Sequence, residues 1–98
     1  MSASITESLP LVTLVTVTYN SEKDLPEFLS CVDSLDYSNL SLVVIDNNSS
    51  DSSVRILETF TSTSVEILPV CNNKNLGISV ANNQGIVAAL EKGSEWIV

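Results

Sequence analysis

The chain has 98 residues, 44% of them hydrophobic, and a formal net charge of −8 with only four basic residues. This length allows one domain at most, and the apolar content excludes a disordered acidic segment. Nucleic-acid binding needs clustered Lys and Arg, whereas the basic residues here are scattered, so we expect no nucleic-acid partner.

The start of the chain and its apolar runs bear on location. Residues 1–10 are mostly polar or small and predict a flexible lead-in, with no basic n-region and no apolar signal core. The longest apolar stretch, 9–17, falls far short of the about 20 residues that a membrane span needs. We therefore expect a cytoplasmic protein without a transmembrane segment, in which both cysteines are reduced.

The first half of the chain predicts strand, helix, strand and helix. Residues 11–19 form a β-branched, almost continuous apolar run, typical of a strand buried on both faces. A helix begins near Lys23 or Asp24, because Pro26 fits only in a first turn. Its predicted apolar face comprises Leu25, Phe28, Leu29, Val32 and Leu35. A second strand over 40–45 ends at Asp46, and a short helix follows over 51–60.

The second half repeats the alternation. Residues 65–71 predict a strand at the sheet edge, because Pro69 cannot donate to a ladder. A helix over 78–92 ends at Gly93, and residues 96–98 open a fourth strand. The predicted buried side of this helix comprises Ile78, Ile86, Ala89 and Leu90. The β-α-β-α-β-α-β order predicts an α/β fold with an open, mostly parallel sheet.

Polar residues follow the first three strands, at the edge where open α/β sheets bind ligands. Asp46 is the most informative of them, because an ionised carboxylate only accepts hydrogen bonds. It would suit the imide N3–H of uracil or thymine, whereas cytosine N3 is itself an acceptor. The alternative is that Asp46 and Asp51 cap the second helix.

Other polar residues have two interpretations as well. Tyr19 could stack on a base, and Asn20 could bind a ribose or cap the first helix. Gly77 would let backbone amides approach a ligand, but glycine also serves ordinary turns. Asn82 and Asn83 are poor helix formers, so one of them is expected to face a ligand or the neighbouring loop.

Three ordered motifs resemble the start of family 2 glycosyltransferases. They are residues 15–20 (Val-Thr-Val-Thr-Tyr-Asn), 43–51 (Val-Val-Ile-Asp-Asn-Asn-Ser-Ser-Asp) and 75–86 (Asn-Leu-Gly-Ile-Ser-Val-Ala-Asn-Asn-Gln-Gly-Ile). The second motif and the paired Asn of the third are similar to the rhamnosyltransferase-type branch. The resemblance covers nearly all of residues 11–98 and implies a truncated nucleotide-sugar-binding domain, half of a GT-A (Rossmann-like) fold.

The resemblance also implies a reaction. Family members transfer a sugar, here rhamnose as a candidate, from a UDP- or dTDP-sugar to a glycan or lipid-linked acceptor, with Mg or Mn and with inversion. By motif match the nucleotide-sugar-binding residues are Thr18, Tyr19, Asn20, Asp46, Asn48, Asn75, Gly77 and Asn82. The metal ligands and the general base of the family are expected beyond Val98, so the chain alone is predicted to be inactive.

Two further expectations follow. The fourth strand would expose an apolar sheet edge that favours self-association, and a lipid-linked acceptor would bring the parent protein to the inner face of the membrane. The alternative function is a non-catalytic nucleotide-binding or interaction module with the same sheet. A dinucleotide-binding domain is excluded, because no G-x-G-x-x-G follows the first strand.

Overall fold

The computed structural model describes residues 9–98. Of the predicted lead-in at 1–10, only Leu9 and Pro10 lie within the described residues. The Leu9 carbonyl accepts a hydrogen bond from Asn39 Nδ2 at 3.0 Å, and the Pro10 carbonyl accepts one from the Tyr37 hydroxyl at 2.5 Å. These bonds attach the start of the first strand to the segment that precedes the second.

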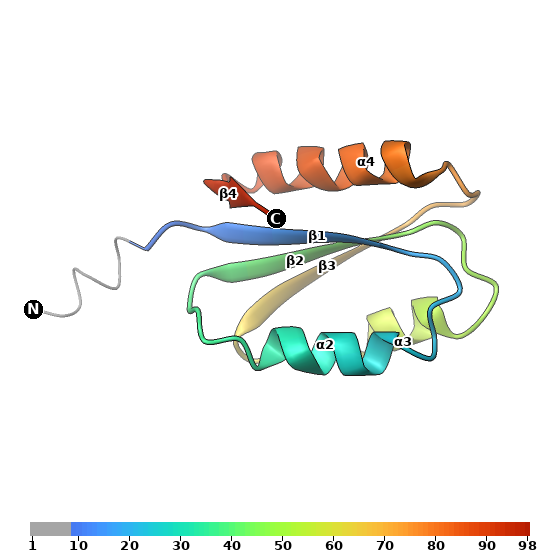
Figure 1. Ribbon diagram of the computed structural model, residues 1–98, viewed down its shortest axis with the longest axis horizontal. Helices are drawn as coiled ribbons and strands as arrows, with labels where there is room; N and C mark the ends of the chain where they lie inside the picture. The colour runs from blue at the N-terminus through green and yellow to red at the C-terminus, as the bar shows by residue number, and fades with distance from the viewer. Residues whose placement is uncertain (1–8) are drawn as a thin grey trace, which may run out of the picture.

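Four parallel strands form the middle layer of the molecule (Figure 1). They are β1 (Val12–Thr18), β2 (Leu40–Asp46), β3 (Val65–Cys71) and β4 (Trp96–Ile97), in the spatial order β3-β2-β1-β4. The predicted α/β fold with an open parallel sheet is confirmed. Pro69 lies on the outermost strand β3, as its missing N–H predicts.

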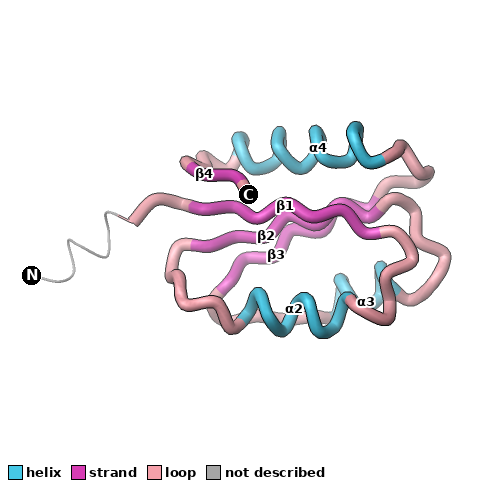
Figure 2. The backbone as a smooth tube through the Cα atoms, viewed as in Figure 1, coloured by secondary structure: helices cyan, strands magenta, loops and turns pink. Residues whose placement is uncertain are grey.

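Three helices cover the two faces of this sheet. Helices α2 (Leu25–Asp33) and α3 (Ser53–Thr59) lie on one face, and α4 (Ile78–Glu91) lies on the other (Figure 2). The predicted end of α4 is confirmed: Gly93 has φ 85°, its N–H bonds the Leu90 carbonyl, and the Ser94 N–H bonds the Ala89 carbonyl at 3.1 Å. This pair of bonds is a Schellman motif. No helix among residues 9–98 has the length and apolar character needed to cross a bilayer.

The face covered by α2 and α3 has a core of large aliphatic residues. Leu25, Leu29 and Val32 of α2 are buried against the sheet, as predicted. The prediction for Phe28 and Leu35 was wrong, because both are exposed. Leu35 lies past the helix end at Asp33 and so leaves the helical face. Phe28 instead borders a small cavity beside β1. The buried members of this core are Leu25, Leu29, Val32, Leu40, Leu42, Val44, Leu57 and Val65.

The face covered by α4 is packed through small residues. Ala81, Gly85 and Ala89, one helical turn apart, are the buried residues of α4. The approach is close: a Cβ added to Gly85 would lie 2.2 Å from Val15 Cγ1. Burial of Ala89 is confirmed. Burial of the other predicted residues was wrong, because the close backbone approach turns large side chains away. Ile78 and Leu90 are 62% and 60% exposed, and Ile86 is exposed as well.

Candidate functional site

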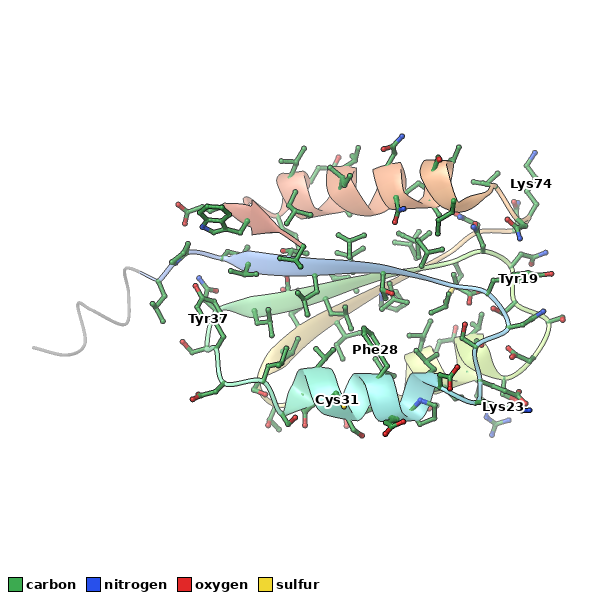
Figure 3. The ribbon with its side chains drawn as sticks, viewed as in Figure 1. Tyr19, Lys23, Phe28, Cys31, Tyr37 and Lys74 are labelled. Carbon is green, nitrogen blue, oxygen red and sulfur yellow. The ribbon has the colours of Figure 1, made fainter. Side chains whose placement is uncertain are left out.

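The carboxyl ends of β1, β2 and β3 lie at one end of the sheet. Thr18, Asp46 and Cys71, the last residues of these strands, are in register. Figure 3 shows Tyr19, which follows β1, and Lys74, which follows β3, at this same end. The sheet order reverses direction between β1 and β4. We call the loops at this end, residues 19–24, 47–52 and 72–77, the carboxyl rim, and it is where open α/β sheets bind ligands.

Asp46 organises the loop that follows β2. Its side chain is fully buried. Oδ1 accepts hydrogen bonds from Thr18 Oγ1 at 2.7 Å and from Ser49 Oγ at 2.6 Å, and Oδ2 accepts one from the Ser49 N–H at 2.8 Å. Both hydroxyl protons therefore point at the carboxylate, so Thr18 and Ser49 have only lone pairs left to offer. Direct contact between Asp46 and a ligand stays a prediction, and what the geometry shows is that Asp46 orients its two hydroxyl neighbours.

Asn20 joins the loop after β1 to the loop after β2. Its N–H donates to Ser49 Oγ, and its Oδ1 accepts from the Ser50 N–H, both at 2.8 Å. Its φ of 49° is in the left-handed region, which Asn adopts more readily than most residues. Asn20 does not cap α2, because Asp24 occupies the N-cap position of that helix. Asn48 is exposed and also left-handed, with φ 70°.

Glu22 and Asp51 make a second connection between the same two loops. The Glu22 N–H donates to Asp51 Oδ2 at 3.1 Å, and the Ser52 N–H donates to Glu22 Oε1 at 2.8 Å. Asp51 Oδ1 accepts from the N–H of Ser53, the first residue of α3, whereas Ser52 occupies the N-cap position and makes no side-chain capping bond. Desolvation would raise the pKa of Asp51, but hydrogen bonds from Ser53 and Glu22 outweigh it and lower that pKa below 3.8.

Asn47 and Asn72 hold the loop that follows β3. Asn47 is 3% exposed. Its Oδ1 accepts from Asn72 Nδ2 at 3.0 Å and from the Leu76 N–H, and its Nδ2 donates to the Gly77 carbonyl at 3.1 Å. Asn72 and Gln84 form a reciprocal amide pair at 2.8 and 2.9 Å. The sequence interpretation missed these three residues. The available signal was an Asn placed directly after each of two strands.

Asn75 and Gly77 lie together before α4. Asn75 Oδ1 accepts from the Gly77 N–H at 2.9 Å, and both residues are exposed. Gly77 has φ 84° and ψ 165°, a conformation that is essentially restricted to glycine. The turn therefore explains the glycine, and contact of either residue with a ligand stays a prediction.

The cavities separate Thr18 from Asn82. Thr18 borders a cavity of about 180 Å³ between β1 and α2. Asn82, exposed on α4, borders one of about 280 Å³ beside Ile97 and Val98. Both open beside β1, which pairs with β4 at Val12 and Thr13. A third cavity, of about 470 Å³, runs along α4 near Val70, and Asn83 lines it, whereas none of the eight residues assigned to the nucleotide sugar by motif match does.

The described residues do not fit a metal ion. Within residues 9–98, no three His, Cys, Asp or Glu side chains come together as a group that could hold one. The oxygens of Asp46 already accept three hydrogen bonds. We therefore derive no metal-dependent step from these residues.

Comparison with known proteins agrees with this architecture. Residues 13–98 match the family model described as glycosyl transferase family 2. A Haemophilus influenzae protein named uncharacterized glycosyltransferase is 31% identical over 80 residues, which are 82% of this chain and 25% of that protein. The chain thus spans about a quarter of the length of this relative. The matched region contains β1 from Thr13 onward, the other three strands and the whole carboxyl rim, in the arrangement expected of the GT-A fold. The chain belongs to glycosyl transferase family 2.

Proposed function

We propose that the carboxyl rim binds the nucleotide of a UDP- or dTDP-sugar, and that the whole protein transfers this sugar to a glycan or lipid-linked acceptor with inversion. One observation carries the proposal: hydrogen bonds connect three loops of a family 2 domain at the carboxyl end of the sheet, and the first of these loops borders its switch point. Loops that are already ordered lose less conformational entropy when a ligand binds, which favours affinity.

The choice of base would depend on the end of β2. Because the carboxylate of Asp46 accepts the hydroxyl proton of Ser49, and the Asn20 N–H uses one lone pair of that hydroxyl, the partly exposed Ser49 would offer its remaining lone pair to a ligand. A uracil or thymine ring offers the N3–H donor that fits such an acceptor, whereas cytosine offers a lone pair at N3. Tyr19 is 53% exposed, which leaves its ring free to stack on the base.

The remaining predicted residues would bind the rest of the donor. Asn20, Asn48, Asn75 and Gly77 would line the nucleotide, and Asn82 would lie toward the sugar, beside the cavity that it borders with Val98. The motif over residues 46–51 supports rhamnose as the sugar. The Mg or Mn ion of the family would be held by residues that follow Val98, so the 98-residue chain would be inactive alone. Sugar transfer or donor hydrolysis by the pure chain would contradict that part.

Partners and location complete the proposal. The parent would act in the cytoplasm, at the inner face of the membrane when its acceptor is lipid-linked. Self-association through the sheet edge is supported by β4, one of the two edge strands of the described sheet, because Trp96 of β4 and the adjacent Val98 are exposed. The alternative is a non-catalytic nucleotide-binding or interaction module with the same sheet. A parent reading frame without Asp-x-Asp after β4 would select this alternative.

Calorimetric titration of the chain with UDP, dTDP and CDP tests the base preference. We expect UDP and dTDP to bind about tenfold more tightly than CDP, a difference of about 1.4 kcal/mol, and Asp46→Asn to remove this preference. Asp36→Asn is the matched control, because it removes the same charge at an exposed position before β2. Thermal unfolding separates lost binding from lost fold. Equal binding of all three nucleotides, unchanged in Asp46→Asn, would contradict the proposal.

A further inference from the structure

We infer that Asn20 and Asn75 are specificity-determining residues that present only amide N–H groups to the ligand, so that these two side chains bind acceptor oxygens of the nucleotide. The inference rests on the proposed nucleotide-binding function and adds a direction to each hydrogen bond. This direction follows from which atom of each carboxamide already makes a hydrogen bond within residues 9–98.

The orientation of the Asn20 side chain is fixed by its partner. A carboxamide has an oxygen that accepts and an NH₂ group that donates, and the partner decides which is which. The partner of Asn20 is the backbone N–H of Ser50, at 2.8 Å, which can only donate. The Ser50 hydroxyl lies 3.4 Å from the same oxygen. Oδ1 is therefore engaged, and in this exposed residue the NH₂ group has no partner among residues 9–98.

Asn75 repeats this arrangement on another loop. Its Oδ1 accepts from the backbone N–H of Gly77 at 2.9 Å, and the residue is exposed. Its NH₂ group makes no hydrogen bond to the part of the chain that the structure describes. Two carboxamides from different loops thus have the same polarity: a backbone amide binds the oxygen, and the NH₂ group has no partner among residues 9–98.

The two residues lie on either side of the loop that follows β2. Asn20 is bonded to Ser49 and Ser50 of that loop, and Asn75 is bonded to Gly77, whose carbonyl is held by Asn47. Both side chains are therefore connected through hydrogen bonds to the loop that follows β2. The two NH₂ groups thus belong to the two loops that flank the loop after β2.

Neutral donors matter here because the chain has few cations. It carries four basic residues against twelve acidic ones. Of the four, Lys92 is paired with Glu66 on the strand β3 and Arg55 lies in α3, which leaves Lys23 and Lys74 as the basic residues of the carboxyl rim. Amide N–H groups bind acceptor oxygens without a charge of their own. The acceptors of a uridine nucleotide are the base carbonyls, the ribose hydroxyls and the diphosphate oxygens.

The test replaces the NH₂ group of each side chain by an acceptor and keeps the oxygen that the backbone amide binds. In Asn20→Asp and Asn75→Asp, an oxygen remains for the Ser50 or Gly77 amide, while the NH₂ group becomes an oxygen that cannot donate. We expect the melting temperature to change by no more than about 2 °C and the affinity for UDP to fall about tenfold or more. Asn73→Asp is the control, because it adds the same charge at an exposed position of the same loop. Its affinity should fall by less than about threefold.

Titrations with uridine, UMP and UDP identify the acceptor. A loss already present with uridine assigns the donors to base or ribose oxygens, and a loss that needs UDP assigns them to the diphosphate. If the natural chain binds none of the three, the proposed function fails and this inference fails with it. If it binds but both Asp variants match Asn73→Asp, the inference alone is overturned. Should an Asp variant unfold, the side-chain NH₂ resonances of Asn20 and Asn75 in the natural chain decide, because nucleotide must shift them.

Discussion

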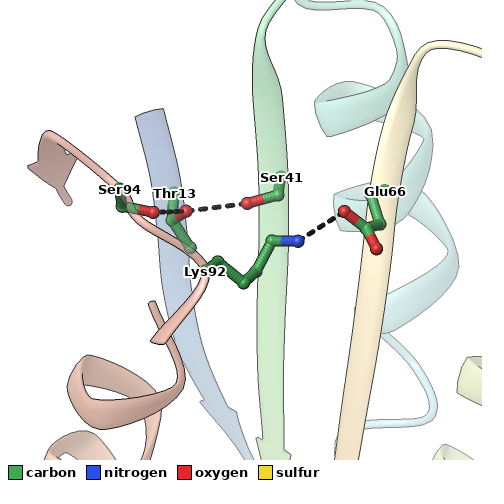
Figure 4. A network of polar contacts seen from close by, with 5 residues as sticks. All are labelled: Thr13, Ser41, Glu66, Lys92 and Ser94. Atoms are coloured by element: carbon green, nitrogen blue, oxygen red, sulfur yellow. Dashed lines mark hydrogen bonds and ion pairs between the residues drawn. The ribbon is translucent and has the colours of Figure 1, made fainter. Parts of the chain in front are cut away.

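The two ends of the sheet are both polar, but they use their polar groups in opposite ways. At the amino end, Thr13 and Ser41 are completely or almost completely buried and bonded to each other at 2.7 Å, and Thr13 also contacts the Ser94 hydroxyl (Figure 4). At the carboxyl rim, Asn20 and Asn75 are exposed and use only their oxygens within the described chain. Thr13, Ser41 and Ser94 form a closed network of hydrogen bonds that stabilises the fold. The NH₂ groups of Asn20 and Asn75 are instead available to a ligand.

An ion pair covers the closed end. Lys92 extends from the end of α4 across β2 to Glu66 on β3, and its Nζ lies 2.5 Å from Glu66 Oε1 (Figure 4). The carboxyl rim is instead held by carboxylates and carboxamides that bond backbone N–H groups. Such bonds fix the course of the loops while leaving side-chain atoms outside. Mutations at the two ends should therefore separate stability from binding.

The largest effect on stability should come from Thr13→Val at the closed end. Valine has nearly the same shape but no hydroxyl, so the buried Ser41 hydroxyl loses its partner. We expect the free energy of unfolding to fall by about 1–3 kcal/mol, measured by denaturant titration, with UDP affinity unchanged. Thr63→Val, at an exposed loop position, is the control and should leave stability within about 0.5 kcal/mol. A loss of UDP affinity in Thr13→Val would show that the two ends of the sheet are coupled and would contradict their separate roles.

Local patterns predict the elements of this chain well but predict its packing unevenly. The β-branched runs and Gly93 locate the strands and the end of α4, because these signals act within a few residues. The buried side of α4 was predicted wrongly. Helical periodicity favours large apolar residues, whereas this helix lies on the sheet through Gly85, close to Val15. That distance is a property of two segments far apart in the sequence, so no pattern within the helix contains it.

The site shows the same limit. The motifs place Asp46, Asn20 and Asn75 at the ends of strands, and the sequence could go that far. It could not supply their partners, because the bonds from Asn20 to Ser50 and from Asn47 to Gly77 each join residues 30 positions apart. Which atom of a carboxamide faces outward depends on those partners. The direction of hydrogen bonding at the carboxyl rim therefore emerges only from the folded structure.

A smaller loss of stability is expected at low pH, and it should originate from Asp51 at the carboxyl rim. The pKa of Asp51 lies below 3.8 in the folded chain. Its contribution to stability is therefore complete above the unfolded value and is lost as the pH falls below 3.8 through the folded value. In denaturant titrations from about pH 6 to about pH 3, Asp51→Asn should lose less stability than the natural chain. Asp36→Asn, the exposed control, should follow the natural chain. If the stability of Asp51→Asn depended on pH in the same way as that of the natural chain, the hydrogen bonds of Asp51 would not stabilise the carboxyl rim.

The smallest effect is expected from the ion pair at the closed end. Lys92 and Glu66 are 22% and 60% exposed, so water and salt screen their charges. Lys92→Met keeps most of the apolar stem and removes the ammonium group, and should lower the free energy of unfolding by no more than about 1 kcal/mol. The difference from the natural chain should shrink in high salt, and Glu66→Gln should behave alike. If Lys92→Met lowered the free energy of unfolding as much as Thr13→Val does, independently of salt, the ion pair would belong to the closed network. The buried hydroxyls would then not account for the stability of this end by themselves.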